Sequence, residues 1–164
     1  MAQTEPERQL IAFTLHGERY ALPIAVVREI VRYTPPRATA AARGAILGLI
    51  NLRDRVLPVA DLSETLGHRL EVTPGTRILV IEVQAGTIGL IVDSVDGVRA
   101  IPERYIGPLP TAAGEVALGD EIAADGGDLI VLIDHERALG AILRPRPQRG
   151  RGGWRLSQRT PPAP

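Results

Sequence analysis

Apolar residues gather along this chain in short runs, and glycine, proline, asparagine or aspartate separates each run from the next. Runs of this length between turn residues predict β-strands. The predicted strands are residues 9–15, 19–24, 46–50, 55–62, 76–83, 87–92, 95–101, 114–124 and 128–133. Many short strands at this spacing indicate an all-β barrel or sandwich rather than a parallel sheet flanked by helices.

Only short helices interrupt this pattern. Ile24, Val27 and Ile30 recur at intervals of three, which predicts a short helix with one buried face. Asp61 and Asp134 each follow a predicted strand and are suited to cap a helical turn. The sequence therefore predicts an all-β protein with a few short helices.

The chain also resembles itself. Residues 56–67 (VLPVADLSETLG) align without gaps on residues 129–140 (LIVLIDHERALG). Upstream, the apolar spacing of residues 24–30 returns at residues 92–98, in both cases after a strand–glycine–strand segment. Two amphipathic segments can align this well by chance, but here both matches occur in the same order. They favour a duplication that produces two similar small barrels.

Charge is distributed unevenly, although 19 basic and 19 acidic residues cancel over the 164 residues. Residues 144–164 carry six arginines and no acid, so the preceding 143 residues hold 13 arginines against 19 acids. An acidic body is a poor match for a folded nucleic-acid-binding surface. Residues 144–164 are rich in proline and glycine with little to bury, which predicts a disordered tail. This tail could hold an anionic lipid or nucleic acid, but a solvated segment is the simpler interpretation.

The composition also excludes most kinds of catalytic site. Cysteine and lysine are absent, which excludes disulfides, thiolate metal sites, P-loops and Schiff bases. His16, His68 and His135 follow no metal-ligand spacing, and Asp93 and Asp96 are more typical of turn formers than of a metal site. The N-terminus has no apolar signal segment, and no apolar run reaches the length of a membrane span. We expect a soluble, cytoplasmic protein without catalytic residues, cofactor, metal or membrane insertion.

Three motifs resemble a known family, and the central one is specific. They are VVREIV at 26–31, GLINLRDRVLPVADL at 48–62 and IGLIVDSVDGV at 88–98. Together they resemble the CheW-domain family of chemotaxis coupling proteins over about residues 9–143. Asp54 departs from the family pattern, which usually has glycine there, and so do His135 and the arginine-rich tail. The resemblance divides the chain into a flexible N-terminus (1–8), a CheW-like domain of two sub-barrels (9–143) and the tail (144–164).

The resemblance implies a fold of two intertwined five-stranded SH3-like barrels, in agreement with the duplication. It also implies a non-enzymatic adaptor that holds a CheA-type histidine kinase, through the kinase's regulatory domain, against the cytoplasmic tip of chemoreceptors. The expected location is the cytoplasm, at membrane-associated receptor arrays. The kinase contact would join one barrel to another, and the receptor's helical hairpin would lie in a groove between the two barrels.

Six residues are candidates for partner binding by this resemblance, and each has a plainer interpretation. They are Val27, Glu29, Gly48, Asn51, Arg53 and Gly89. Arg53 is predicted at a hairpin tip, where a guanidinium can grip a carboxylate or be merely solvated. Asp54 could pair with Arg53 and weaken that role. Val27 could equally be core, and a glycine inside a strand can reflect a bulge as well as a close approach.

Two other functions remain open from the sequence. One is a CheW-like paralogue in a non-flagellar pathway, such as pilus motility or gene regulation. The other is a small-barrel nucleic-acid binder, which would need exposed aromatic residues and a basic face. Only five aromatic residues exist in the chain, so stacking recognition of bases has little support.

Overall fold

The computed structural model describes residues 5–40, 42–110 and 118–143. Its strands and helical turns follow the apolar runs of the sequence. The elements are β1 (Glu7–Leu15), β2 (Glu18–Pro23), η1 (Ile24–Val26), β3 (Val27–Arg32), β4 (Ile46–Leu52), β5 (Arg55–Ala60), β6 (Arg77–Val83), β7 (Gly86–Val92), β8 (Ser94–Pro102), η2 (Glu103–Tyr105), β9 (Ile106–Pro108), β10 (Glu121–Asp125), β11 (Asp128–Leu132), η4 (Glu136–Gly140) and α1 (Ala141–Leu143). The all-β prediction is confirmed. The predicted tail, and the first residues of the strand expected from residue 114, lie outside the described residues.

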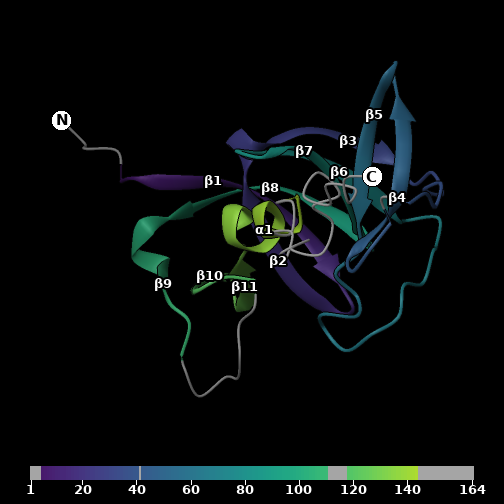
Figure 1. The fold of residues 1–164 in the computed structure, drawn as a ribbon. Coiled ribbons are helices and arrows are strands. Elements are labelled where there is room, and N and C mark those ends of the chain that lie inside the picture. The colour runs from purple at the N-terminus through teal and green to yellow at the C-terminus, as the bar shows by residue number, and fades with distance from the viewer. Residues whose placement is uncertain (1–4, 41, 111–117, 144–164) are drawn as a thin grey trace, which may run out of the picture.

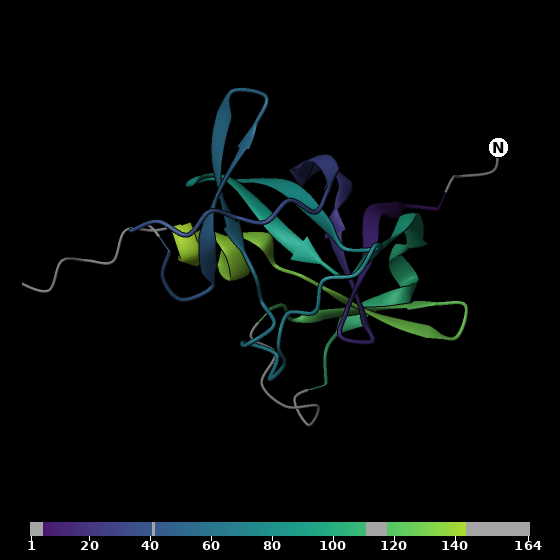
Figure 2. The same cartoon turned by 90° about the vertical axis from the view of Figure 1, so that its right-hand side faces the viewer.

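The strands form two sheets that exchange hairpins (Figures 1 and 2). One sheet has the order β8-β1-β2-β11-β10-β9, and the other has the order β3-β6-β7-β5-β4. The β1–β2 hairpin thus pairs with strands from the second half of the chain, whereas the β6–β7 hairpin pairs with strands from the first half. This exchange gives two intertwined SH3-like barrels, as expected. The six-stranded barrel has one short strand, β9, beyond the five that were predicted.

The two sheets have the same strand order when the two halves of the chain are superimposed. Shifting β1, β2 and β3 by 68 residues places them on β6, β7 and β8, and shifting β5 by 73 places it on β11. Under this correspondence the five-stranded order becomes the order of β8-β1-β2-β11-β10. Even the parallel contact recurs, because β11 pairs parallel with β2 as β5 pairs parallel with β7. The strand order supports the duplication inferred from the sequence.

One central core joins the barrels. Phe13 and Leu22 from the six-stranded sheet pack in the same buried cluster as Leu79 and Leu90 from the five-stranded sheet. Leu139 of η4 belongs to this cluster and is fully buried, so the C-terminal helical turns cover the junction. Each barrel also has a smaller cluster of its own. Because the largest cluster is shared, we expect neither barrel to be stable alone.

The predicted helix at residues 24–30 is wrong. Only Ile24–Val26 forms a single 3₁₀ turn, and the chain continues as β3 paired with β6. Ile24 and Ile30, which were expected on a buried helical face, are 39% and 42% exposed. A spacing of three over so few residues also suits an edge strand, and the ladder with β6 supplies backbone hydrogen bonds that one helical turn cannot match.

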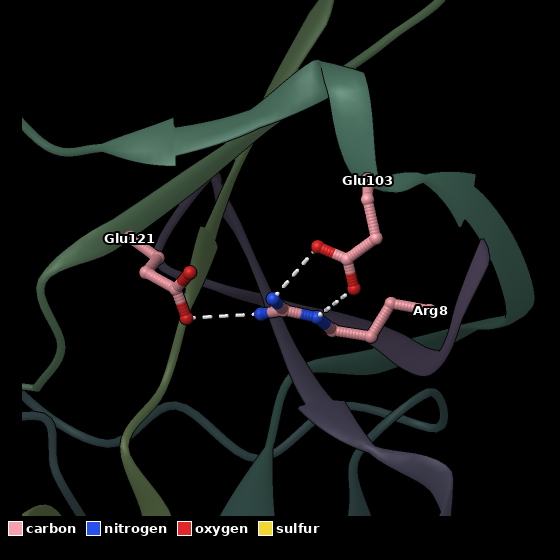
Figure 3. A network of polar contacts seen from close by, with 3 residues as sticks. All are labelled: Arg8, Glu103 and Glu121. Carbon is pink, nitrogen blue, oxygen red and sulfur yellow. Dashed lines mark hydrogen bonds and ion pairs between the residues drawn. The ribbon is translucent and has the colours of Figure 1, made fainter. Parts of the chain in front are cut away.

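The last two residues of the N-terminal segment, Glu7 and Arg8, belong to a strand. Residues 1–8 were expected to be flexible, yet β1 begins at Glu7. In Figure 3 the Arg8 guanidinium lies between two carboxylates: it donates to Glu103 through Nε and Nη2, at 3.0 Å each, and to Glu121 through Nη1 at 2.9 Å. These hydrogen bonds hold the pKa of Arg8 above its ordinary value. Arg8 therefore ties β1 to η2 and β10 in the six-stranded barrel.

Candidate functional site

The β4–β5 hairpin projects from the five-stranded barrel and ends in a two-residue turn (Figures 1 and 2). Arg53 and Asp54 form this turn with φ angles of 48° and 63°. Positive φ at both central positions is the type I′ geometry that matches the twist of a hairpin. Asn or Asp followed by Gly is the usual choice, so the glycine that the family usually has at position 54 suits the geometry, and Asp54 is a tolerated substitute.

A groove of about 290 Å³ opens beside this hairpin, between β3, β6 and β7. Its floor is apolar and its rim is charged or polar. The floor comprises Leu52, Leu57 and Val80, and the rim comprises Arg28, Glu29, Arg53, Arg55, Glu82 and Thr87. On the rim, the Arg28 guanidinium forms an ion pair with the Glu82 carboxylate. Arg55 Nη2 donates a hydrogen bond to the Thr87 hydroxyl at 3.4 Å. An apolar floor inside a polar rim is suited to hold side chains of another protein.

Arg53 reaches across the groove to Glu29. Their Nη2 and Oε1 atoms are 2.7 Å apart, although the two residues lie on opposite edges of the five-stranded sheet. The Arg53 side chain is 79% exposed, whereas that of Glu29 is 26% exposed. The structure therefore brings together two of the predicted site residues, and Arg53 pairs with Glu29 rather than with its neighbour Asp54. Because the pair is solvated, it contributes little to stability and leaves most of the guanidinium open to a partner.

Val27 and Asn51 border the same region. Val27 begins β3 and is half-buried against the central core, so it is partly the core residue that its plainer interpretation anticipated. Asn51 is exposed on β4, directly opposite Val56 on β5. Both residues are on the elements that carry Glu29 and Arg53, but neither lines the groove itself.

Gly48 and Gly89 are buried and have structural reasons inside the protein. A Cβ at Gly48 would lie 2.2 Å from the backbone oxygen of Arg37, and the β4–β5 register also shifts at this point. A Cβ at Gly89 would lie 2.9 Å from Ile78 and 3.3 Å from Val59. The atoms that leave no room for a side chain at each glycine therefore belong to this protein and not to a partner. We leave both residues out of the proposed contact surface.

Several groove residues escaped the sequence analysis because they come from strands far apart in the chain. Leu57 and Val80 looked like ordinary strand core, and Glu82 and Thr87 looked like ordinary hairpin residues. Val56 is 63% exposed beside the turn, which is unusual for a large apolar residue in a strand. The repeat could have signalled it, because shifting Val56 by 73 residues gives Leu129, which is 65% exposed.

The second barrel also has an ion pair beside its hairpin, although its residues are not the repeat counterparts of Glu29 and Arg53. In the five-stranded barrel, acidic Glu29 on β3 pairs with basic Arg53 at the hairpin tip. In the six-stranded barrel, basic Arg99 on β8 pairs with acidic Asp125, the last residue of β10 before the turn, at 3.5 Å. Leu129 lies next to that second tip. Each barrel thus has a hairpin tip with an ion pair and one exposed apolar residue.

A polar cluster of His16, Asp61 and Ser63 between the barrels has a structural rather than a catalytic geometry. The Ser63 hydroxyl donates to the Asp61 carboxylate at 2.6 Å, and His16 Nε2 lies 2.8 Å from the same hydroxyl oxygen. Ser63 is 1% exposed, and its proton is directed at the carboxylate rather than at the imidazole. A nucleophilic serine needs the reverse order, with the histidine as base. This cluster fastens the β1–β2 turn to the segment after β5.

Asp93 and Asp96 also serve the junction. Asp93 accepts a hydrogen bond from the His16 backbone N–H at 2.7 Å, and Asp96 accepts one from the Thr14 hydroxyl at 3.0 Å. The two carboxylates therefore fix β8 and its entry to β1. Among the described residues, no group of acidic, histidine or cysteine side chains is arranged to hold a metal ion.

We predict an alkaline loss of stability that depends on Tyr20. Burial, aided by its hydrogen bond to Glu18 at 3.0 Å, raises the pKa of Tyr20 to about 12. The folded state therefore holds this proton more tightly than the unfolded state, whose pKa is about 10. The stabilisation is fully present below pH ~10 and is lost by pH ~12, with a magnitude of up to about 2 kcal/mol. When the free energy of unfolding is measured by chemical denaturation between pH 9 and 11.5, it should fall less steeply with pH for Tyr20→Phe than for the wild type. Tyr105→Phe, at an exposed tyrosine, should follow the wild type; a profile for Tyr20→Phe as steep as the wild type would contradict this assignment.

Two intertwined SH3-like barrels with an open groove and exposed hairpin tips define a class of protein-binding β-barrel adaptor. The family model of the CheW-like domain matches residues 9–142. The chain is 35% identical over 134 residues to the chemotaxis protein CheW of Rhizobium meliloti, covering 80% of this chain and 86% of that protein. It is 32% identical to protein FrzA of Myxococcus xanthus, covering 84% of this chain and 89% of that protein. The crystal structure of the scaffolding protein TtCheW from Thermoanaerobacter tengcongensis is similar with a TM-score of 0.71 and 31% identity, covering 78% of this chain and 89% of that one.

The chain belongs to the CheW-like domain family. Its members are adaptor and scaffold proteins of chemotaxis, and this protein is accordingly an adaptor rather than an enzyme. No helix among the described residues is long and apolar enough to span a membrane.

Proposed function

We propose that this protein couples chemoreceptors to a CheA-type histidine kinase in the cytoplasm, at membrane-associated receptor arrays. The observation that carries the proposal is the groove beside the β4–β5 hairpin, across which Arg53 pairs with Glu29. All of its lining residues belong to the five-stranded barrel, so the proposed receptor site lies within that barrel and not between the two barrels as the resemblance implied. Its apolar floor suits side chains from one face of a receptor helix, and its charged rim suits the polar flanks of that helix. Family membership supports the general role in chemotaxis.

In this proposal the receptor contact comprises Val27, Glu29, Asn51 and Arg53. Arg53 is the central residue, because a guanidinium held at one end by Glu29 still has donors for a receptor carboxylate or for helix carbonyls. Pairing with Glu29 also restricts the arginine before the partner arrives, which reduces the entropy lost on binding.

An adaptor needs a second surface for its second partner. The β10–β11 hairpin belongs to the other barrel, and Leu129 at its tip is 65% exposed. We assign this tip to the kinase's regulatory domain, which by resemblance is a barrel of the same kind. An exposed leucine next to a tip is suited to become buried when two barrels meet.

The test is co-sedimentation of variants with receptor-containing membranes and the kinase. Arg53→Ala should weaken assembly about ten- to a hundredfold, because a charge-assisted hydrogen bond is worth about 1.5–3 kcal/mol. Its free energy of unfolding should change by no more than about 0.5 kcal/mol, since the ion pair is solvated. Arg43→Ala, at an exposed arginine outside the groove, is the matched control and should assemble like the wild type.

The two surfaces can be separated in the same assay. Leu129→Ser should lose the kinase while still binding receptor membranes, whereas Arg53→Ala should lose receptor binding first. Wild-type assembly by a folded Arg53→Ala would refute the role of Arg53. Loss of receptor by Leu129→Ser would refute the division between the barrels.

A further inference from the structure

Arginines without a carboxylate partner are concentrated in one part of the chain. Residues 32–77 hold seven arginines and four acidic residues, although the body as a whole is acidic. All six arginines elsewhere in the described residues pair with a carboxylate; they are Arg8, Arg19, Arg28, Arg99, Arg104 and Arg137. Within residues 32–77 only Arg53 does so among the described contacts.

Two of these arginines face each other across neighbouring strands. Arg32 at the end of β3 is directly opposite Arg77 at the start of β6 in the antiparallel register. Side chains in such a pair project from the same face of the sheet at close range, and like charges there are destabilising. An acidic residue in place of either arginine would remove this repulsion, yet both positions are arginine.

A hollow of about 410 Å³ lies over this pair. It is lined by Arg32, Tyr33, Val72, Thr73, Pro74, Thr76 and Arg77. None of these seven residues carries a carboxylate. The two guanidiniums therefore supply the whole formal charge of the lining.

The polar groups of the lining are arranged as donors. Arg77 Nη1 donates to the backbone oxygens of Pro74 and Thr76, at 2.8 and 2.9 Å, which holds the guanidinium in place with Nε and Nη2 still available. The hydroxyl oxygen of exposed Thr73 accepts the Gly75 N–H at 3.2 Å, so this hydroxyl retains its own proton to donate. The Thr76 hydroxyl accepts the Thr73 N–H at 2.9 Å and is buried, so it holds the loop rather than faces a ligand.

We propose that this hollow binds a phosphate group. Two guanidiniums and the exposed Thr73 hydroxyl match a tetrahedral dianion, whose charge neutralises both arginines at once. A carboxylate would leave one positive charge uncompensated. The group could be free phosphate or a phosphate monoester, and the two sources are distinguished below. This site is separate from the groove of the proposed function and does not depend on it.

The direct test is a titration of the full chain with inorganic phosphate, followed by NMR at constant ionic strength maintained with sodium chloride. We expect saturable shifts of the backbone amides of residues 73–77 and of the Arg77 Nε–H, with a Kd of about 1 mM. A second titration with O-phosphoserine distinguishes the sources. Binding at least as tight as that of phosphate indicates a monoester, whereas binding of phosphate alone indicates the free ion.

Arg32→Glu is the decisive variant, because it has opposite effects on two properties. Phosphate affinity should fall at least tenfold, while the melting temperature without phosphate should rise, since the introduced carboxylate would pair with Arg77 instead of repelling it. Arg43→Glu, a charge reversal outside the hollow, should keep the wild-type affinity. Arg32→Gln removes the charge with less change and serves if the glutamate variant does not fold. Shifts that chloride reproduces, or an affinity that neither Arg32 variant lowers, would overturn the proposal.

Discussion

Truncating Phe13 to alanine should destabilise the protein by about 4 kcal/mol and should weaken both barrels together. Phe13 is fully buried in the central cluster that contains residues of both sheets. It also stacks on Tyr20, with ring centroids 6.2 Å apart and an interplanar angle of 24°. Removing a buried aromatic ring loses its transfer free energy and leaves a cavity, which together cost about 3–5 kcal/mol.

Urea denaturation followed by circular dichroism is the measurement. The midpoint should fall while the transition stays single, because the shared core couples the barrels. Tyr105→Ala is the control, since Tyr105 is an exposed aromatic residue on η2 and its loss should cost less than about 1 kcal/mol. Two separate transitions in Phe13→Ala would show that the barrels are independent, contrary to the hairpin exchange.

Gly48→Ala should cost about 3 kcal/mol, although it adds a single methyl group. The new Cβ would lie 2.2 Å from the carbonyl oxygen of Arg37 and 2.5 Å from its carbon. Those atoms are backbone, and Arg37 is held by two hydrogen bonds to Leu49 at 2.8 and 2.9 Å. The substitution must therefore break this bridge or bend β4, and overpacking of this kind costs about 1–3 kcal/mol before the lost hydrogen bonds are added.

Gly107→Ala is the matched control for this substitution. Gly107 also lies in a strand, β9, but no atom outside its chain neighbours lies within 4 Å of the position that its Cβ would take. It should change the free energy of unfolding by less than about 0.5 kcal/mol. Equal stability of the two variants would mean that the segment at Arg37 gives way freely. Reduced receptor binding by a Gly48→Ala protein of wild-type stability would return Gly48 to the contact surface.

The comparison of the two barrels bears on how an adaptor of this kind could evolve. A duplicated barrel begins with two identical tips, which would compete for one partner. Here the two tips differ: Arg53 stands in one turn and pairs with Glu29, whereas the corresponding turn residue of the other hairpin is Gly126, and the ion pair beside it joins Arg99 to Asp125. Different charges at the two tips would let each tip discriminate between two partners, which is how charge patterns create specificity.

The sequence by itself determined the parts of this protein whose cause is local. The β4–β5 and β6–β7 hairpins were predicted because each joins neighbouring strands through a short turn, and the duplication was visible because β5 and β11 retain the same pattern. The family resemblance came from the same local motifs. It also led to Arg53 and Glu29, although nothing in their spacing showed that they meet.

Only the tertiary structure decided the features that depend on distant parts of the chain. The segment at residues 24–30 became an edge strand because β6, about fifty residues away, supplies its hydrogen bonds. The exchange of hairpins, the Arg53–Glu29 pair and the facing arginines Arg32 and Arg77 arise in the same way, from strands paired across the two halves. Periodicity reports which side of a strand is buried but not which strand lies beside it, because pairing is fixed by packing across the whole barrel.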